Sequence, residues 1–491
     1  MGSSSPLDLA VADDCIAPKK RRIWCDVQQA VQSHGRISAL PDDILIKILS
    51  LMTIREAAST DCLSTRWRHL WKNVNSVTLD KHNLGMKAIA NQNDHENSDP
   101  WNLEATRFVH KVNGVLRHHS GNGIKKFEVK FPLSSTHASE LDCWAAFAAA
   151  SSAEHIKFVL DYKHVMQVTQ QSEPYNFPLK EFADARDCQL RALYLSMCSL
   201  ETVPAKLSGF SYLESLSLHH VSIVDAVFLY VVSSCHALRQ LCLKNCSQLI
   251  HARISNSKLV CMEVLGCKSL ISINILAEKL EHFSYMGQKV DIEYECAPAL
   301  RELNAHFVKR NQCPLDCIGE VSVLQKLTMG FPSPLQVSRV LQHSGRFMVL
   351  KEMVLCLMTS WEKSILSVVY LLKAAPLVEI LNLEVYGNLK PLQSLEITWP
   401  VDFTAEALST VSIGGFSGES ELVDLLLFLL RRSPTLRTLQ ICTRRRRYGG
   451  YGRSSKRDKF EDTTRRCYAR GVAFIHLLLK VPPSVKFIIS S

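Results

Sequence analysis

A short pattern, apolar-x-x-apolar-x-apolar, recurs along most of this 491-residue chain and limits its possible folds more than any other feature. Copies begin at Leu190, Leu213, Leu238, Leu259, Leu280, Leu300, Leu324, Leu350, Val378, Leu408 and Leu436, and the stretches from Ile124 and Ile156 look like earlier, longer copies. A single strand of this kind cannot bury its apolar face alone, so neighbouring copies are expected to stack into one curved parallel sheet. The pattern therefore predicts a repeat solenoid.

Successive copies start 20 to 30 residues apart, which is the spacing of leucine-rich repeats. In such repeats an Asn or Cys near the end of the strand satisfies backbone groups at the turn, which accounts for Cys246 and, by analogy, Cys267. Charged residues between the apolar positions are expected to point to the concave face, where they either bind a partner or only keep the face soluble; they are Arg191, Glu214, Arg239 and Arg301.

Composition agrees with a large folded core. The chain is 47% hydrophobic and 21% charged, and no apolar run is long enough to predict a membrane span or a signal peptide. Its 17 cysteines are spread out, which favours a reducing compartment over a disulfide scaffold. The close pairs Cys242/Cys246 and Cys313/Cys317 lack a second pair at zinc-site spacing, so no metal and no cofactor are expected.

Positive charge is concentrated in two places, although the net charge is +10 overall. The loop Arg444–Lys459 is rich in Arg, Gly and Ser, and it is expected to be a solvated flexible loop or, alternatively, a contact for nucleic acid or the import machinery. A second basic run in the N-terminal tail has the form of a nuclear import signal: Lys19, Lys20, Arg21 and Arg22. The expected localisation is the nucleus, the cytoplasm or both.

Residues 36–80 carry helical patterns instead of the repeat. Pro41 suits a first helical position, and the pair Thr53 and Glu56 has the spacing of a capping box for a second helix. Ser64 is expected to cap a third helix that carries Trp67 and Trp71 on one face. Three short helices make a very small core, so either the tryptophans pack internally or they meet a partner protein.

The stretch from Arg36 to Trp71 resembles a plant-type F-box, on the strength of Leu40-Pro41, the apolar stripe that follows, Glu56-Ala57 and the closing Arg66-Trp67-Arg68-x-Leu70-Trp71 segment. The resemblance implies docking on a Skp-type adaptor, which bridges to a cullin–RING ubiquitin ligase. It assigns adaptor contact, or direct support of it, to eight residues: Leu40, Pro41, Ile44, Leu45, Ile48, Leu49, Trp67 and Trp71. Two departures from the usual pattern are Thr53 and Asp61-Cys62.

Residues Leu408 to Ile441 resemble the FBD motif of plant F-box and leucine-rich-repeat proteins. A turn containing Gly415, Phe416 and Gly418 leads to a leucine-rich helix, expected at Glu421–Leu430, and then to one more strand. The expected physical role of this region is to close the exposed end of the repeat array.

No motif of an enzyme is recognisable in the sequence. The chain lacks a phosphate-binding glycine loop, a Gly-x-Ser-x-Gly elbow and a His-Glu-x-x-His helix, and the pairs His118-His119 and His219-His220 have no ligand partners nearby in sequence. Sequence alone leaves a Cys–His nucleophile pair open, because such partners meet only in the folded chain.

These observations predict an α/β fold with a tail (residues 1–34), a three-helix F-box (35–80), a leucine-rich-repeat array (81–407) and an FBD-like cap (408–491). The expected function is target recognition for a ubiquitin ligase, without catalysis by this chain, leading to ubiquitination and degradation of an unknown target protein. Two alternatives remain: a nuclear protein that binds nucleic acid through the basic loop, and a repeat scaffold that has lost the adaptor.

Overall fold

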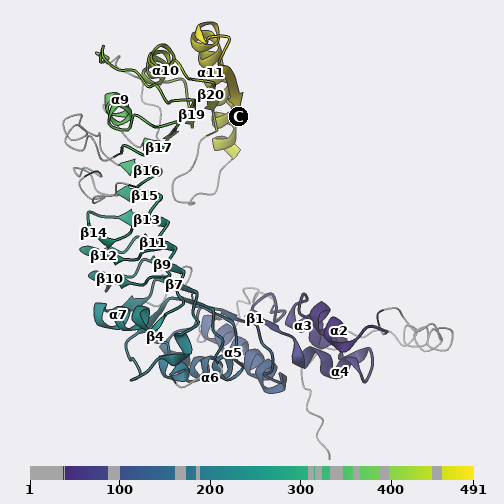
Figure 1. The fold of residues 1–491 in the computed structure, drawn as a ribbon. Helices are drawn as coiled ribbons and strands as arrows, with labels where there is room; N and C mark the ends of the chain where they lie inside the picture. The colour runs from purple at the N-terminus through teal and green to yellow at the C-terminus, as the bar shows by residue number, and fades with distance from the viewer. Residues whose placement is uncertain are drawn as a thin grey trace, which may run out of the picture.

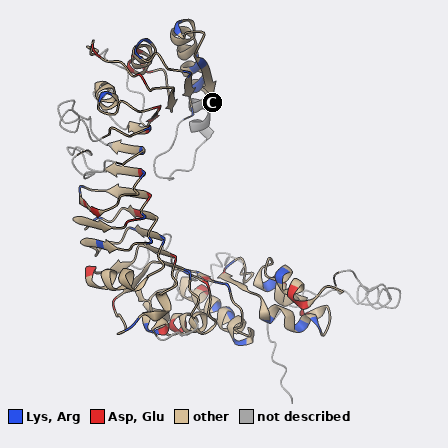
Figure 2. Cartoon of the chain, viewed as in Figure 1, with Lys and Arg blue, Asp and Glu red and all other residues tan. Residues whose placement is uncertain are grey.

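The chain folds into one long array with a small helical unit at its N-terminal end (Figure 1). The structure is a computed structural model. It describes residues 37, 39–86, 100–160, 173–183, 188–307, 315, 323–331, 347–357, 365–386, 397–444 and 456–490. Among the helices it describes, none has the length and apolar character that crossing a membrane requires. Side chains of both charges occur on the N-terminal helices and along the array (Figure 2).

The backbone of the array is one sheet of fifteen strands, and every neighbouring pair is parallel. In spatial order the strands are β1 (Ser76–Asp80), β2 (Lys126–Lys130), β3 (His155–Val159), β5 (Ala192–Ser196), β7 (Ser215–His219), β9 (Gln240–Lys244), β11 (Cys261–Leu265), β13 (His282–Gly287), β15 (Glu302–Phe307), β16 (Lys326–Phe331), β17 (Glu352–Leu357), β18 (Ile380–Val385), β19 (Thr410–Gly414), β20 (Thr438–Cys442) and β21 (Lys486–Ser490). The predicted solenoid is therefore confirmed.

The register of the strands follows the apolar pattern in all but one of the predicted copies. The second and third apolar residues of each copy are buried, as Leu193 and Leu195 are in β5, while the residues between them face outward. The copy predicted to start at Ile156 was placed three residues late. Ile156 pairs with Phe127, the second apolar residue of its own copy, so this repeat begins at Ala153.

Sequence reading also missed the first strand of the sheet. Val77 in β1 pairs with Phe127, and Val74, Val77 and Leu79 are fully buried at the positions of the repeat pattern. The last five residues of the predicted F-box thus form the first strand of the sheet.

The length of each repeat decides what covers the other face of the sheet. Where equivalent residues lie 20 or 21 residues apart, from Gln240 to Glu302, short strands return along the convex side: β10 (His251–Ser255), β12 (Ser272–Leu276) and β14 (Asp291–Cys296). Repeats of 25 or more residues have room for helices, among them α5 (Pro100–His118), α6 (Ala138–Ala150), α7 (Asp225–Ser234), α9 (Ile365–Ala374), α10 (Ser420–Arg432) and α11 (Lys456–Leu477). A third sheet joins β4 (Tyr175–Asn176), β6 (Cys198–Leu200) and β8 (Ser222–Ile223).

A row of buried phenylalanines holds successive early repeats together. The ring centroids of Phe158 and Phe177 lie 5.4 Å apart, those of Phe177 and Phe182 5.8 Å, and those of Phe182 and Phe210 5.9 Å. All four side chains are fully buried. Each ring belongs to a different part of the chain, so the row couples neighbouring repeats through direct aromatic contacts, which stabilise more than area burial alone.

The FBD-like region continues the array. The strands β19, β20 and β21 extend the same parallel sheet, and α10 contains the helix predicted at Glu421–Leu430. Leu425 and Leu429 of this helix are almost completely buried. The predicted loop Arg444–Lys459 is shorter at its C-terminal end, because α11 already begins at Lys456. Residues 445–455 of that loop lie outside the described part of the chain.

Candidate binding surfaces

The first three helices are α2 (Asp42–Leu49), α3 (Ile54–Ser59) and α4 (Trp67–Leu70). The capping box at α3 is confirmed, since Thr53 Oγ1 accepts from the Glu56 amide at 3.2 Å and the Glu56 carboxylate accepts from the Thr53 amide at 3.1 Å. The hydroxyl of Ser64 accepts from the Trp67 amide at the start of α4, at 3.4 Å. Pro41 lies one residue before the helix, at the N-cap position.

Arg66 ties the end of this unit back to its beginning. Its Nε donates to Asp42 Oδ1 at 2.8 Å, and its Nη2 donates to the Leu40 carbonyl at 2.6 Å. The arginine of the Arg66-Trp67-Arg68 segment therefore orients the Leu40-Pro41 entry, a positioning role that the sequence motif did not reveal.

The eight predicted adaptor residues separate into two groups. Four are buried within the unit: Leu45, Leu49, Trp67 and Trp71. Leu40 and Ile44 are half-buried, and Pro41 and Ile48 are exposed. The two tryptophans thus pack internally in the free chain, where they can support a contact surface, and the accessible four can form one.

Sequence reading missed four further apolar side chains on the same unit. Leu51 is 89% exposed and Leu63 is 60% exposed, and Ile37 and Met52 are also exposed. We call these four and Ile48 the F-box apolar patch. Their exposure could be read only from the folded helices, because all five belong to residue types that usually enter a core.

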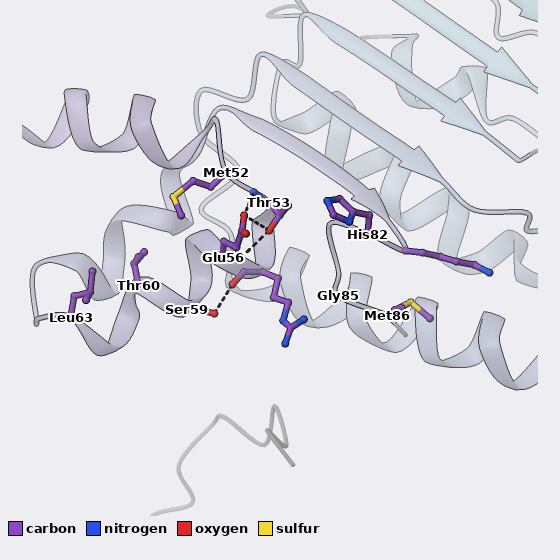
Figure 3. Close-up of a pocket in the computed structure, with 11 residues that line it drawn as sticks. Met52, Thr53, Glu56, Ser59, Thr60, Leu63, His82, Gly85 and Met86 are labelled. Carbon is purple, nitrogen blue, oxygen red and sulfur yellow. Dashed lines mark hydrogen bonds between the residues drawn. The ribbon is translucent and has the colours of Figure 1, made fainter. Parts of the chain in front are cut away.

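A pocket of about 720 Å³ opens beside this patch, between α3 and the turn that follows β1 (Figure 3). Met52 and Leu63 of the patch belong to its lining, together with Arg55, His82 and Met86. Gly85, in the turn, has a φ of +60°, and a Cβ there would lie 2.3 Å from Arg55 Cδ. Glycine is needed at this turn for both reasons, and the Arg55 side chain is held against it.

The array joins this helical unit through a network of hydrogen bonds. The Asn75 amide donates to Ser50 Oγ at 3.1 Å, and the Ser120 amide donates to the Lys72 carbonyl at 2.9 Å. The buried ring of His119 bridges Val74 and Gly121, accepting at Nδ1 from the Gly121 amide, at 3.0 Å, and donating from Nε2 to the Val74 carbonyl, also at 3.0 Å. Burial lowers the pKa of His119, so the neutral ring that this bridge needs is favoured.

The predicted concave charges lie directly before the strands. Arg191, Glu214, Arg239 and Arg301 are in equivalent positions, because each of their amides bonds to the carbonyl of the corresponding residue one strand earlier. Arg191 Nη1 pairs with Glu214 Oε1 at 2.7 Å, and both side chains are about half exposed. These residues line one rim of the sheet, and the strand residues themselves line its concave surface.

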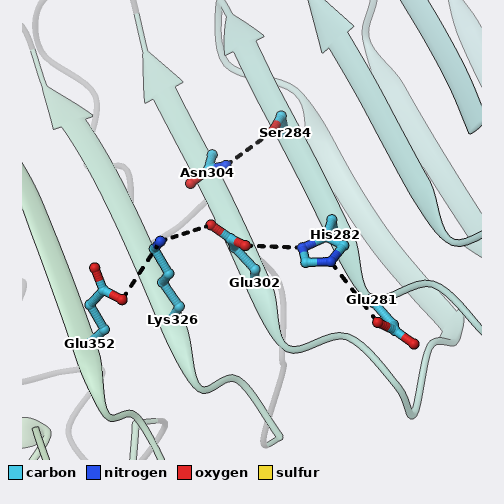
Figure 4. Close-up of polar contacts among 7 residues, drawn as sticks. All are labelled: Glu281, His282, Ser284, Glu302, Asn304, Lys326 and Glu352. Atoms are coloured by element: carbon cyan, nitrogen blue, oxygen red, sulfur yellow. Dashed lines mark hydrogen bonds and ion pairs between the residues drawn. The ribbon is translucent and has the colours of Figure 1, made fainter.

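Polar side chains link four neighbouring strands in the middle of that surface (Figure 4). Glu302 accepts from His282 Nδ1 at 3.0 Å and lies 3.3 Å from Lys326 Nζ. Lys326 Nζ also lies 3.6 Å from Glu352 Oε2, and Glu352 accepts from Asn382 Nδ2 at 3.2 Å. Burial opposes the charge on Lys326, but the two glutamates outweigh it, so its pKa is raised. We call Glu302, Lys326 and Glu352 the central concave cluster.

A Cys–His contact does occur on the concave surface, which answers the question that sequence left open. Cys242 Sγ lies 3.6 Å from His219 Nε2, and His219 Nδ1 lies 2.8 Å from the Tyr194 hydroxyl. Burial and the carboxylate of Glu263, which is 3.5 Å from the sulfur, raise the pKa of Cys242 to about 12. A nucleophilic cysteine needs a lowered pKa, so this arrangement disfavours a thiolate.

The remaining cysteine and basic-run predictions have different outcomes. Cys246 is buried, and its thiol lies 3.5 Å from the Leu218 carbonyl, as expected of a residue that satisfies the turn. Within the described residues no group of three His, Cys, Asp or Glu side chains is arranged to hold a metal ion. The pair Cys313/Cys317 and the basic run Lys19–Arg22 lie outside the described residues.

Comparison with known proteins finds two matching families. Residues 37–79 match the F-box domain, and residues 115–491 match the family described as "At1g61320/AtMIF1, LRR domain". Among similar proteins of Arabidopsis thaliana, an F-box/FBD/LRR-repeat protein, At1g13570, is 27% identical over 45% of this chain and 46% of its own length. An F-box/LRR-repeat protein, At3g03360, is 28% identical over 46% of this chain and 42% of its own. An F-box protein, At5g03100, is 26% identical over 64% of this chain and 89% of its own. The chain thus spans about half the length of the first two relatives.

Proposed function

Because the chain belongs to the leucine-rich-repeat family described by the At1g61320/AtMIF1 LRR domain and carries an F-box domain ahead of the repeats, we propose that it is the target-recognition subunit of an SCF-type (Skp–cullin–F-box) ubiquitin ligase. Proteins with this pair of domains are generally such receptors and typically non-catalytic adaptors, and an F-box domain generally implies binding to a Skp-type adaptor. In the proposed complex the F-box holds the adaptor, the concave surface holds a target protein, and the target is ubiquitinated and degraded.

The observation that carries the proposal is the F-box apolar patch. Five large apolar side chains are exposed within 27 residues of one small helical unit, at positions 37–63. Exposed apolar side chains grouped in this way are a sign of a protein contact. The neighbouring pocket, lined in part by Met52 and Leu63, offers a place for a side chain of the adaptor.

The junction between F-box and array supports a geometric role in catalysis. The His119 bridge and the hydrogen bonds at Ser50 and Lys72 connect the helical unit directly to the first two strands. A target on the concave surface would then be held in one orientation relative to the adaptor. Such a receptor accelerates transfer of ubiquitin by proximity and orientation, without supplying a reacting group.

The proposal is tested by co-purification with a Skp-type adaptor. Leu51→Asp/Leu63→Asp is expected to abolish binding, because it places two charges in an apolar interface while changing side chains that the free chain leaves exposed. Leu40→Ala/Pro41→Ala is expected to weaken binding as well. Leu479→Asp is the matched control, since Leu479 is 90% exposed at the other end of the chain and lies outside the F-box.

Adaptor binding that survives Leu51→Asp/Leu63→Asp contradicts the proposed surface. A wild-type chain that never binds adaptor favours the alternative of a repeat scaffold that has lost its ligase. The other alternative, a nuclear nucleic-acid-binding protein, requires the Arg444–Lys459 loop to bind nucleic acid with an affinity that falls steeply as salt is raised.

A further inference from the structure

The charges on the concave surface are unevenly distributed along the array. In the register of the sheet, the outward positions of β1 to β9 carry four lysines and two carboxylates: Lys126, Lys130, Lys157, Lys244, Asp80 and Glu128. The same positions of β11 to β20 carry one lysine and four carboxylates: Lys326, Glu263, Glu302, Glu352 and Glu384. One end of the surface is therefore basic and its middle is acidic.

The basic end is next to the F-box and is built around one buried carboxylate. Lys130 Nζ lies 2.6 Å from Glu128 Oε2, and Lys126 Nζ lies 3.2 Å from Glu128 Oε1. Burial raises the pKa of Glu128, but the two lysines outweigh this effect and lower it overall. Lys157 on the next strand lies 4.3 Å from the centre of the Tyr194 ring. Three lysines thus share one carboxylate, which leaves an excess of positive charge.

The acidic middle is the central concave cluster. Lys326 is shared by Glu302 and Glu352, and Glu281 adds a third carboxylate 4.0 Å from His282 Nε2. Only about a quarter of each side chain of Glu302 and Glu352 is exposed, and each is fixed by a second hydrogen bond. Each carboxylate offers about four acceptor positions, so acceptors remain for an incoming guanidinium or ammonium group.

Partial burial makes these carboxylates more effective than ordinary surface charges. A cation that approaches them meets groups already desolvated and held in place, so less ordering is needed on binding. An exposed surface ion pair contributes little by comparison. The fixed geometry across β15, β16 and β17 favours a planar, multidentate donor such as arginine.

We propose that the concave surface binds an extended segment of the target that places one or more basic residues on the central concave cluster and acidic residues over Lys126, Lys130 and Lys157. This inference rests on the proposed function and specifies its target. The strands β2 and β15 are seven positions apart in the sheet. At about 4.8 Å per strand the two charge centres are roughly 34 Å apart, which about ten extended residues span.

The test is selection from a displayed library of random 16-residue peptides against the complex of the full chain with its adaptor. The expected winners carry Arg or Lys about ten positions from Asp or Glu. A winning peptide is then expected to bind Glu302→Gln/Glu352→Gln about tenfold or more weakly, since each lost charge contact is worth roughly a factor of ten. Its affinity for wild type should also fall between 0.05 M and 0.3 M NaCl.

Two controls keep the test decisive. Glu302→Lys/Glu352→Lys should reject these peptides, while Glu278→Lys/Asp291→Lys, which makes the same charge change at exposed positions outside the concave surface, should bind them normally. Circular dichroism melting of each variant reports whether it is folded.

Winning peptides without this charge pattern, undiminished binding to a folded Gln variant, or no winners at all would each overturn the inference, and the last two would mean that the charges only keep the surface soluble. Adaptor binding is measured on the same samples. Its loss would refute the proposed function separately.

Discussion

Replacing Arg465 by Ala should destabilise the C-terminal part of the array more than any other single change of a half-exposed side chain there. The guanidinium of Arg465, on α11, donates to the Thr443 carbonyl at 2.7 Å and to the Phe416 carbonyl at 3.3 Å, and it also bonds Ser417 Oγ. These acceptors lie on the segments that follow β19 and β20, so one side chain fastens the last helix to two strand ends.

The magnitude follows from what the substitution leaves behind. Ser417 and Thr443 are buried, so they lose partners where water cannot easily replace them. Glu419, which is 8% exposed, loses a nearby positive charge. Removing a hydrogen-bond partner from a buried group costs about 1–3 kcal/mol, and breaking a buried charge pair costs about 3–5 kcal/mol. Because Arg465 is only half-buried, we expect a total near 3 kcal/mol.

Chemical unfolding followed by circular dichroism measures this loss, with Arg470→Ala as the matched control. Arg470 is on the same helix and is exposed, so its removal should change the free energy of unfolding by less than about 0.5 kcal/mol. Burial already raises the pKa of Glu419, and losing Arg465 should raise it further.

The pH dependence gives a second readout. A folded-state pKa above the unfolded value means that the folded chain binds the proton more tightly. The charged carboxylate therefore destabilises the fold above the unfolded pKa, and this cost is relieved as the pH falls toward 4.5. The deficit of Arg465→Ala should shrink accordingly. Equal stability of the two arginine variants, or a deficit that grows as the pH falls, would refute this reasoning.

Three further predictions concern the core, the junction and the tail. Leu425→Ala/Leu429→Ala should unfold the C-terminal repeats or make the chain aggregate, because each buried leucine contributes about 2–5 kcal/mol; a melt like that of the parent would show that α10 is dispensable. The lowered pKa of His119 means that the unfolded chain binds the proton first, so its contribution to stability should be lost as the pH falls through about 6.5, and His119→Gln should flatten that slope in denaturant titrations between pH 5 and 8. Changing Lys19, Lys20, Arg21 and Arg22 to Ala should move a fluorescent fusion toward the cytoplasm in microscopy, and an unchanged distribution would exclude this run as the import signal.

Local patterns in the sequence were enough to predict the repeat and the caps. The spacing of Leu190, Leu193 and Leu195 encodes a strand with one buried face, and Thr53 with Glu56 encodes a helix start, because both depend on contacts between residues close in sequence. The helix at Glu421–Leu430 was predicted to within two residues at each end for the same reason.

What sequence could not predict depends on contacts between distant residues. Arg465 finds its carbonyl partners 22 and 49 residues away, and no spacing rule links them. The register error at Ile156 arose because Ala153, a small residue, takes the position that Leu usually fills. The charge pattern of the concave surface emerges only when strands 20 to 37 residues apart are set side by side, as Glu302 and Lys326 are in Figure 4.

Isothermal titration calorimetry of the full chain with a purified Skp-type adaptor, repeated at several temperatures, measures adaptor binding most directly. We expect saturable one-to-one binding with a negative heat-capacity change, since the F-box apolar patch would leave water on binding. Leu51→Asp/Leu63→Asp should abolish the heat signal, and Leu479→Asp should not. A folded wild-type chain that gives no saturable heat at any temperature, or a complex that the double variant forms equally well, would contradict the assignment of this surface to the adaptor.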